Sequence, residues 1–223
     1  MLCDDALLIE DSKENLQNIL IKFDQSAKKL NMEISLKKTK CLSTSKANQK
    51  CEIKLGDTIL EQVAKFNYLG VEISSNGNLR EVVKTQVTKG ARISGCLNNL
   101  IWRNRYMSAE SKVRIYKTSV RPVLTYAAET RADTITTQQL LRTTEMRIIR
   151  TIQGKTLRGR VRSEHSRQIS GIPDIVDWVG TRKREWPAHV DRMGEDRLAK
   201  VAKEGRSQGV RSRGRPKKDR KRA

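Results

Sequence analysis

Residues 66–78 read F-N-Y-L-G-V-E-I-S-S-N-G-N, and this stretch separates a region of short strands from a region of helices. Residues 66–73 are rich in aromatic and β-branched side chains, which favours a strand. Asn76-Gly77 is a strong turn signal. After Asn78 the spacing of apolar residues changes to that of helices. The sequence therefore predicts an α+β fold in which strands precede helices.

One helix and several short strands are expected upstream of this stretch. Residues 11–31 carry an apolar stripe at helical spacing, made by Leu16, Ile19, Leu20, Phe23, Ala27 and Leu30. Asp11 with Glu14 resembles a capping box at the start of this helix. Residues 1–10 suit a β-hairpin with two acidic residues at its turn. Further strands are expected at residues 33–35, 40–42, 53–55 and 58–60, with Gly56-Asp57 as a hairpin turn between the last two.

The region after Asn78 predicts a series of helices. Ser108 is placed to cap one of them, and Arg121-Pro122 is expected to break it. Pro122 then starts the next helix from its first turn, and Gly154 ends the last of the series. The expected helices cover residues 79–103, 108–120, 122–126 and 137–152.

The charge of the chain favours a polyanionic partner. Lys and Arg number 46 against 25 Asp and Glu, which gives a formal net charge of +21. A charge that large repels itself in a compact state, so nucleic acid is the first candidate partner and an anionic membrane surface the second. No apolar run approaches the roughly 20 residues that span a bilayer. The early aspartates also interrupt the apolar segment that a secretory signal needs.

The cysteines indicate neither a metal site nor disulfides. No C-x-x-C pair occurs, and only two histidines could complete a zinc site, so zinc is not expected. Isolated cysteines without a secretory signal are typical of a reducing compartment. The residues concerned are Cys3, Cys41, Cys51, Cys96, His165 and His189.

Three motifs occur in a fixed order in the first part of the chain. Cys3-Asp4-Asp5 opens it, I-S-L-K-K-T-K occupies residues 34–40, and F-N-Y-L-G-V occupies residues 66–71. Their order and spacing resemble the second half of a reverse-transcriptase palm. In that family a Y-x-D-D hairpin is followed by a helix, an N-x-x-K-T-K strand entry and a Y-L-G primer-grip strand.

Four later segments resemble the jockey-like type of non-LTR (LINE-type) retrotransposon. Residues 122–130 (P-V-L-T-Y-A-A-E-T) are similar to P-x-L-x-Y-G-x-E-x-W, and residues 145–154 (E-M-R-I-I-R-T-I-Q-G) to E-x-x-x-L-R-x-I-x-G. Residues 189–193 (H-V-D-R-M) and 214–216 (G-R-P) match the terminal H-V-x-R-M and G-R-P-x-K segments. The resemblance covers essentially the whole chain.

Several positions depart from the family pattern. Leu2 and Cys3 replace the expected Tyr and Ala before the aspartates, and Arg131 stands where Trp is usual. Pro187 lies inside the expected W-x-G-H-V helix, where it removes a backbone donor. The first palm carboxylate motif and the fingers are expected upstream of Met1. The chain alone is therefore expected to lack template-directed DNA synthesis.

The resemblance assigns catalytic positions to Asp4, Asp5 and Lys38. Nucleotidyl transfer uses two metal ions held by carboxylates. Asp4 resembles the main ligand and Asp5 the supporting ligand, for Mg²⁺ that this fragment is expected to hold weakly or not at all. Lys38 matches the lysine that protonates the leaving pyrophosphate or steadies the incoming phosphates. The alternatives are a polar turn for the aspartates and a solvated basic strand end for Lys38.

The resemblance also assigns contacts to nucleic acid. Tyr68, Leu69 and Gly70 match the primer grip and would position the primer backbone, whereas the alternative is an ordinary strand with Gly at a bulge. The helices after Asn78 resemble the thumb, and their basic residues either face phosphates or form a solvated helix face: Lys84, Lys89, Arg92, Arg103 and Arg105. Core packing is expected for Trp178, Trp186 and His189.

The end of the chain is a basic tail. Residues 206–223 hold nine basic residues and one acidic residue, and we expect them to be disordered when free. R-G-R-P at residues 213–216 equals the core of an AT-hook, and a generic basic tail is the alternative. Residues 217–222 also suit a nuclear import signal, so a nuclear location is expected, and otherwise a cytoplasmic one. Nucleic-acid contacts are expected from Arg211, Arg213, Gly214, Arg215, Lys217 and Lys218.

These features lead to one first hypothesis and two alternatives. The first is a truncated RNA-directed DNA polymerase fragment that binds RNA and DNA as template and primer and has no membrane partner. The alternatives are a non-catalytic nucleic-acid-binding protein derived from such an element, and a decayed copy without function. The expected parts are a partial palm of antiparallel strands and one helix at residues 1–77, a helical thumb and connector at 78–154, a C-terminal helical region at 155–205, and the basic tail at 206–223.

Overall fold

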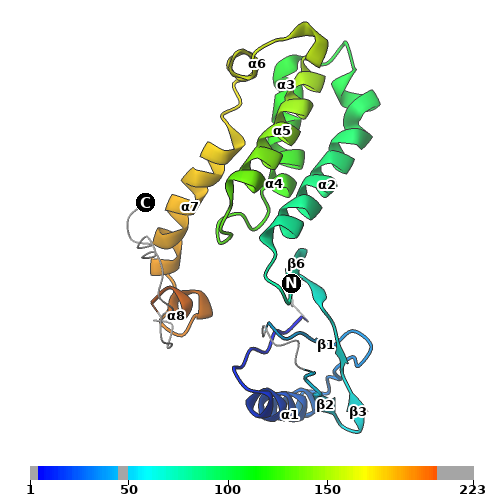
Figure 1. The fold of residues 1–223 in the computed structure, drawn as a ribbon, viewed down its shortest axis with the longest axis vertical. Coiled ribbons are helices and arrows are strands. Elements are labelled where there is room, and N and C mark those ends of the chain that lie inside the picture. Colours follow the sequence, from blue (N-terminus) through cyan, green and yellow to red (C-terminus); the bar gives the residue numbers. More distant parts are fainter. Residues whose placement is uncertain (1–4, 45–49, 205–223) are drawn as a thin grey trace. The chain divides into compact units, whose positions relative to one another are not determined.

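The computed structural model describes residues 5–44 and 50–204 and divides into two compact units, Met1–Thr85 and Gln86–Ala223. In the described part of the chain, every strand lies in the first unit, while the second unit is built from helices (Figure 1). The predicted α+β class is therefore confirmed. None of the helices in this part is both long and apolar enough to cross a bilayer.

Helix α1 (Lys13–Lys29) confirms the helix expected at residues 11–31. Its N-cap is Ser12, whose hydroxyl accepts a hydrogen bond from the Asn15 amide at 3.1 Å, so the predicted capping box of Asp11 and Glu14 is wrong. Leu20 packs in a small core with residues of the strand region: Cys41, Ile53 and Leu60. Phe23 and Leu30 remain 39% and 69% exposed, so part of the predicted apolar stripe faces solvent.

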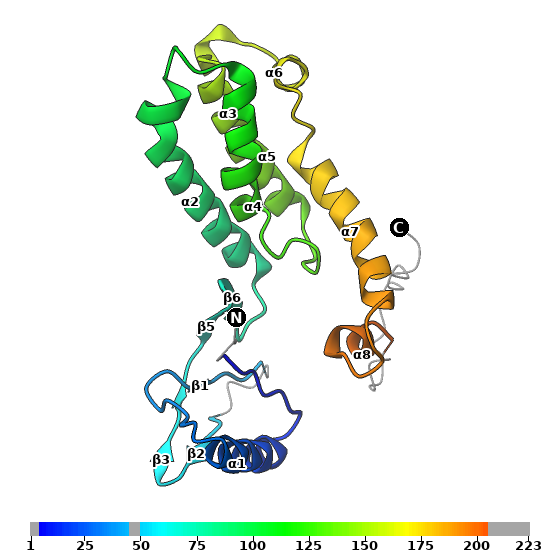
Figure 2. The same cartoon turned by 180° about the vertical axis from the view of Figure 1, so that it is seen from behind.

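The strands of the first unit form three separate pairs, not one sheet. β1 (Lys40–Cys41) pairs with β4 (Glu61–Gln62) in parallel, although only antiparallel pairs were expected. β2 (Lys54–Leu55) pairs with β3 (Thr58–Ile59) across the predicted Gly56-Asp57 turn, beside α1 (Figure 2). Residues 33–35 and 5–10 form no strand in the described part of the chain, because a strand must pair with a neighbouring strand and neither segment joins one of the three pairs found there.

The single strand predicted at residues 66–73 is a β-hairpin. β5 (Lys65–Tyr68) pairs with β6 (Val71–Ser74), and Tyr68 lies opposite Val71. Leu69 and Gly70 form the two-residue turn, with φ of 48° and 82°. Two positive φ values in succession are typical of the type I′ turn, whose twist matches that of the flanking strands. The glycine therefore serves a turn and not a bulge.

The second unit begins within α2 (Leu79–Leu97), which continues as the π-helix η1 (Asn98–Trp102). Ser108 caps α3 (Ala109–Ile115), as predicted. The break expected at Arg121-Pro122 is wrong: the π-helix η2 (Tyr116–Val120) leads directly into α4 (Arg121–Leu124). The amide of Arg121 donates to the Tyr116 carbonyl in a wider turn, and Pro122 then occupies the first turn of α4, where no donor is needed.

Helix α5 (Ile135–Ile152) is central to the second unit and contacts α3, α6 (Ser163–Ser170) and α7 (Ile175–Asp191) (Figure 1). The helix ends before Gly154, as predicted, and the chain continues through the short 3-10 helix η3 (Leu157–Gly159). α8 (Leu198–Glu204) contacts α7. The apolar side chains that α5 buries are Leu141, Met146, Ile148, Ile149 and Ile152.

The aromatic residues of α7 lie nearer the surface than predicted. Trp178 and Trp186 are half-buried, and His189 is exposed, so core packing is wrong for His189. The guanidinium of Arg121 lies 4.7 Å from the ring centroid of Trp178, which is a cation–π contact. Pro187 lies inside α7 without ending it.

Two glycines of α2 provide a matched test of packing in the second unit. A Cβ on Gly90 would lie 2.4 Å from Cδ2 of the fully buried Leu124, whereas a Cβ on Gly95 would meet nothing within 4 Å. We expect Gly90→Ala to destabilise the protein by ~1–3 kcal/mol through overpacking. Gly95→Ala should stabilise it by up to ~1 kcal/mol through helix propensity. Urea unfolding of both variants measures the difference, and equal effects would contradict close packing of α2 against Leu124.

Candidate functional site

The predicted metal site is represented by one aspartate in the described part of the chain. Asp4 lies outside the described residues, and Asp5 is exposed in a segment without regular structure. No group of three or more His, Cys, Asp or Glu that could hold a metal ion occurs in residues 5–44 and 50–204. One exposed carboxylate does not fit Mg²⁺, which needs several oxygen ligands in octahedral geometry.

Lys38 lies in a turn that precedes β1. The amides of Lys38 and Thr39 both donate to the Ser35 carbonyl, at 3.1 and 2.9 Å, and the Thr39 hydroxyl donates to the same oxygen at 2.8 Å. The Lys38 side chain is exposed. Lys40, two residues later, forms an ion pair with Glu61 across the β1–β4 pair. The K-T-K motif thus supplies one exposed and one paired lysine, and the phosphate role of Lys38 stays a prediction.

Tyr68, Leu69 and Gly70 lie together at the end of the β5–β6 hairpin. Tyr68 is half-buried, while Leu69 and Gly70 are exposed. The type I′ geometry fixes the backbone of this turn, since both of its residues occupy the left-handed region. A primer contact at this turn would involve backbone groups at a hairpin end and not the edge of a long strand. The assignment to primer binding is a prediction that this geometry leaves open.

The buried thiol of Cys41 belongs to the small core beside α1. Burial, together with the neighbouring Cys51, raises the pKa of Cys41 to about 11. A thiol in this state is a protonated core residue and not a thiolate ligand.

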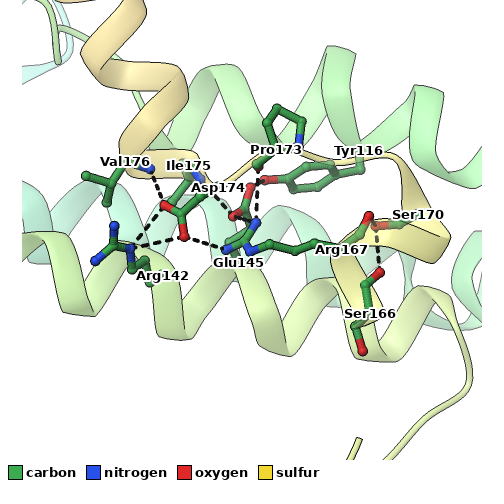
Figure 3. Close-up of polar contacts among 10 residues, drawn as sticks. All are labelled: Tyr116, Arg142, Glu145, Ser166, Arg167, Ser170, Pro173, Asp174, Ile175 and Val176. Carbon is green, nitrogen blue, oxygen red and sulfur yellow. Dashed lines mark hydrogen bonds and ion pairs between the residues drawn. The ribbon is translucent and has the colours of Figure 1, made fainter. Parts of the chain in front are cut away.

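The strongest polar cluster in the second unit was not predicted, and it is centred on Glu145 of α5 (Figure 3). The Tyr116 hydroxyl donates to Oε1 of Glu145 at 2.6 Å. Oε2 accepts from the Arg167 guanidinium at 2.6 Å and from the Ile175 amide at 3.1 Å. Since Glu145 and Tyr116 are fully buried, this carboxylate joins η2, α5, α6 and the start of α7 in the interior.

A second carboxylate extends the cluster to its rim. Asp174 caps α7 by accepting from the Val176 amide at 2.8 Å, and it also accepts from Nε of Arg142 at 3.1 Å. Arg167 lies between the two acids: it donates to Glu145 and forms an ion pair with Asp174 at 3.3 Å (Figure 3). Its guanidinium further donates to the Pro173 carbonyl at 3.1 Å.

For both acids, burial raises the pKa and pairing with donors lowers it, but the balance differs between Glu145 and Asp174. Burial raises the pKa of Glu145, and the hydrogen bonds from Tyr116 and Arg167 offset this only in part. Burial alone would also raise the pKa of Asp174, but the bond from the Val176 amide and the nearby arginines outweigh it and hold the pKa low. For Tyr116, burial and the adjacent Glu145 raise the phenol pKa. The buried carboxylate has donors on both oxygens and no exposed surface, so the cluster is a structural joint and not a catalytic site.

The sequence contained a signal for this cluster. Glu145 occupies a position of the apolar stripe of α5, four residues after Leu141 and four before Ile149. A charged residue at such a position must be paired when it is buried. The periodicity therefore indicates a buried acid, although it does not identify the residues that donate hydrogen bonds to it.

Arg131, which replaces the tryptophan usual in the family, is buried. Its Nε donates to Asp133 at 2.7 Å, and Lys183 of α7 donates to Asp133 at 2.8 Å and to the Arg131 carbonyl at 2.6 Å. This pairing accommodates the charge, although the two terminal guanidinium nitrogens find no partner among the described residues.

The remaining predicted contacts fall in two groups. Arg92, Arg103 and Arg105 of the helical region are exposed, as is Lys84, while Lys89 is half-buried. The tail positions lie outside the described residues: Arg211, Arg213, Gly214, Arg215, Lys217 and Lys218.

Comparison with known proteins finds relatives among mobile elements. The chain is 26% identical over 212 residues to a transposon-derived protein of Caenorhabditis elegans, an alignment that covers 91% of this chain and 75% of that protein. It is 28% identical over 204 residues to the RNA-directed DNA polymerase from the mobile element jockey of Drosophila funebris, covering 87% of this chain but only 19% of the polymerase. No family model matches the chain. No solved structure matches it either. The homologues confirm the predicted resemblance to a jockey-like reverse-transcriptase fragment.

Replacing the buried acid tests its role as a joint. Glu145→Gln keeps the shape but removes the charge opposite Arg167, and we expect a loss of about 3 kcal/mol, because removing one partner of a buried pair leaves the other uncompensated. The matched control is Glu185→Gln on α7, where the acid is exposed and lies 3.6 Å from Arg182. That change should cost no more than ~0.5 kcal/mol. Similar unfolding free energies for the two variants in urea would contradict the assignment.

The low pKa of Asp174 predicts a dependence of stability on pH. A carboxyl whose pKa is lowered by folding contributes stability above its ordinary pKa near 3.8 and loses it as pH falls through the lower folded value. We expect Asp174→Asn to be less stable than wild type by about 1–2 kcal/mol at neutral pH, since Asn still caps α7 but faces the arginines uncharged. In urea unfolding at a series of pH values, the difference in unfolding free energy between wild type and Asp174→Asn should disappear in acid. Asp177→Asn, on the same helix but without an ion pair among the described residues, should show a smaller loss of stability at neutral pH.

Proposed function

We propose that this chain is part of a jockey-like non-LTR retrotransposon reverse transcriptase that binds template-primer nucleic acid but does not polymerise by itself. The observation that carries the proposal is the alignment of 87% of the chain with an RNA-directed DNA polymerase. The net charge of +21 supports it, because counterion release by clustered Lys and Arg dominates binding to nucleic acid. The chain spans only 19% of that polymerase, so its activity is not transferred.

The proposed division of labour follows the motifs. Asp4 and Asp5 would hold Mg²⁺ weakly, Lys38 would contact phosphates, and the turn at Leu69-Gly70 would touch the primer backbone. The exposed Lys38 and the exposed hairpin end are compatible with such contacts. Asp5, the described carboxylate of the pair, is exposed.

A second candidate is a non-catalytic nucleic-acid-binding protein derived from such an element. The observation that favours it is the worm relative, a transposon-derived protein of which the alignment covers 75%. The segment that this chain represents makes up most of that relative. For either candidate we propose a nuclear location, on the basis of the basic residues 217–222.

Binding can be measured by fluorescence anisotropy with labelled duplex DNA and RNA. We expect micromolar or tighter affinity at low salt with little sequence preference. If about five phosphates are neutralised on duplex DNA, log K should fall with log salt at a slope of about −4 to −5. Deleting residues 206–223, which carry nine basic residues and one acid, should weaken binding and flatten that slope. No measurable binding by wild type would exclude the proposal.

Two further variants separate the alternatives. Arg213→Lys with Arg215→Lys keeps the charge, so a plain basic tail should bind as before. An AT-hook should lose its preference for A·T-rich over G·C-rich duplexes, because Lys does not replace the flat guanidinium in a narrow groove. In primer extension with Mg²⁺ or Mn²⁺, incorporation that disappears in Asp4→Ala would show that the chain is an active polymerase.

A further inference from the structure

The connection from α5 to α6 carries a concentrated positive charge. Residues 147–162, which we call the basic connector, include the end of α5, the 3-10 helix η3 and the approach to α6. The segment contains no acidic residue and six basic ones: Arg147, Arg150, Lys155, Arg158, Arg160 and Arg162. This is a density of charge that folding alone does not favour.

None of these six side chains forms an ion pair with an acid in the described part of the chain. Elsewhere in the second unit, several basic side chains pair with Asp or Glu: Arg131, Arg142, Arg167, Arg182, Lys183, Lys200 and Lys203. Arg150 instead donates to the Ser163 hydroxyl at 3.2 Å, which is an uncharged partner. The charge of the basic connector is therefore left for a partner outside the unit.

The basic connector presents this charge outward from an ordered backbone. Arg147, Arg158, Arg160 and Arg162 are exposed, and the other two are half-buried. Gly154 adopts φ of 64°, and the Lys155 amide donates to the Arg150 carbonyl at 2.8 Å, as in a Schellman ending of α5. The Gln153 side-chain amide donates to the Ser166 carbonyl at 2.7 Å and ties α5 to α6. Fixed charges lose less entropy on binding than charges on a free chain.

The start of α6 adds backbone donors to the same place. Arg162 is the N-cap, and its side chain forms no capping hydrogen bond with the first amides of this helix. Amides at a helix start favour a bound phosphate, in particular beside arginines. Glu164 in the first turn is exposed and opposes this charge in part. The six basic residues still outnumber it.

We propose that the basic connector binds the phosphate backbone of nucleic acid without reading its bases. The inference rests on the proposed function and assigns it a surface separate from the tail and from α2. Arginine forks match phosphate oxygens in pairs, which explains the preference for Arg over Lys here. Residues 147–162 contain no Phe, Tyr or Trp. Since base stacking on single strands needs aromatic side chains, duplex and single strands should both be accepted.

A nucleic acid fits this surface better than an anionic membrane does. Three apolar residues of the basic connector, Ile148, Ile149 and Ile152, are buried in the core of the unit. Leu157 is 77% exposed and is the large apolar side chain that the segment offers to a bilayer. Peripheral membrane segments combine basic residues with a continuous apolar face, and one leucine is no such face.

The test compares two charge-matched triple variants of the full chain. The first is Arg158→Gln, Arg160→Gln and Arg162→Gln in the basic connector. The control is Arg184→Gln, Arg192→Gln and Arg197→Gln, which removes the same charge from exposed arginines elsewhere in the second unit. We expect the first triple to weaken duplex binding about tenfold or more and to reduce the salt slope by about 2 to 3. The control should change affinity less than about threefold, because only the general charge term is lost.

Four outcomes decide the inference. Retained binding in the corresponding Arg→Lys triple supports a phosphate contact, and equal loss in both Gln triples overturns the basic connector as a distinct surface. If wild type binds but the first triple is unchanged, the inference fails while the proposed function stands. If wild type binds vesicles of phosphatidylserine and phosphatidylcholine through these arginines, and not nucleic acid, the partner is a membrane and both proposals fail.

A measurement on the unaltered protein covers the case in which the first triple does not fold. Three exposed arginines of the basic connector are trypsin sites, so bound duplex should slow cleavage after Arg158, Arg160 and Arg162. Cleavage after Arg192 and Arg197 in the same sample provides the comparison. Equal protection of both groups would overturn the inference.

Discussion

The second unit depends on a carboxylate that is placed where an apolar residue would ordinarily lie. Glu145 lies on the buried face of α5 and is surrounded by a phenol, a guanidinium and a backbone amide. Each donor comes from a different element, so the carboxylate fixes the positions of η2, α6 and the start of α7 relative to α5. The desolvation of the charge is offset only while all these donors are in place, and this makes the joint specific as well as costly.

This joint also explains how the charges of the second unit are distributed. Arg142, Arg167 and Lys183 are used in interior or rim pairs that hold α5, α6 and α7 together. The arginines of the basic connector lie just beyond this joint and have no such pairs in the described residues. A rigid interior thus positions a surface whose charge is unneutralised, which is the arrangement that a polyanion ligand favours.

The first unit is held together differently. Its core is small, with Leu20 of α1 against Cys41, Ile53 and Leu60, and its strands form three short pairs. The motif residues Lys38, Leu69 and Gly70 lie in turns on the surface of this unit. The loosely covered α1, with Phe23 and Leu30 exposed, shows that the apolar stripe of this helix exceeds what the described strands cover.

The sequence by itself determined the order of strands and helices, the helix ends near residues 79, 102, 109 and 152, and the relationship to mobile-element proteins. These features depend on local spacing, on caps such as Ser108, and on motif letters, all of which are properties of neighbouring residues. The sequence also marked Glu145 as a charge within an apolar stripe. Its partners could not be read, because Tyr116 and Arg167 lie 29 and 22 residues away in the chain.

Only the tertiary structure decided which strand-like segments pair and which helices continue past a predicted break. Residues 66–73 have the composition of one strand, yet the chain folds back at Leu69-Gly70, because both residues adopt positive φ and β6 then pairs with β5. Residues 33–35 have strand-like composition but join no strand pair among residues 5–44 and 50–204, and the Ser35 carbonyl accepts from the turn at Lys38 and Thr39 instead. Likewise, Pro122 is tolerated because a π-helical turn precedes it. In each case the competing local conformations are close in energy, and distant contacts select one of them.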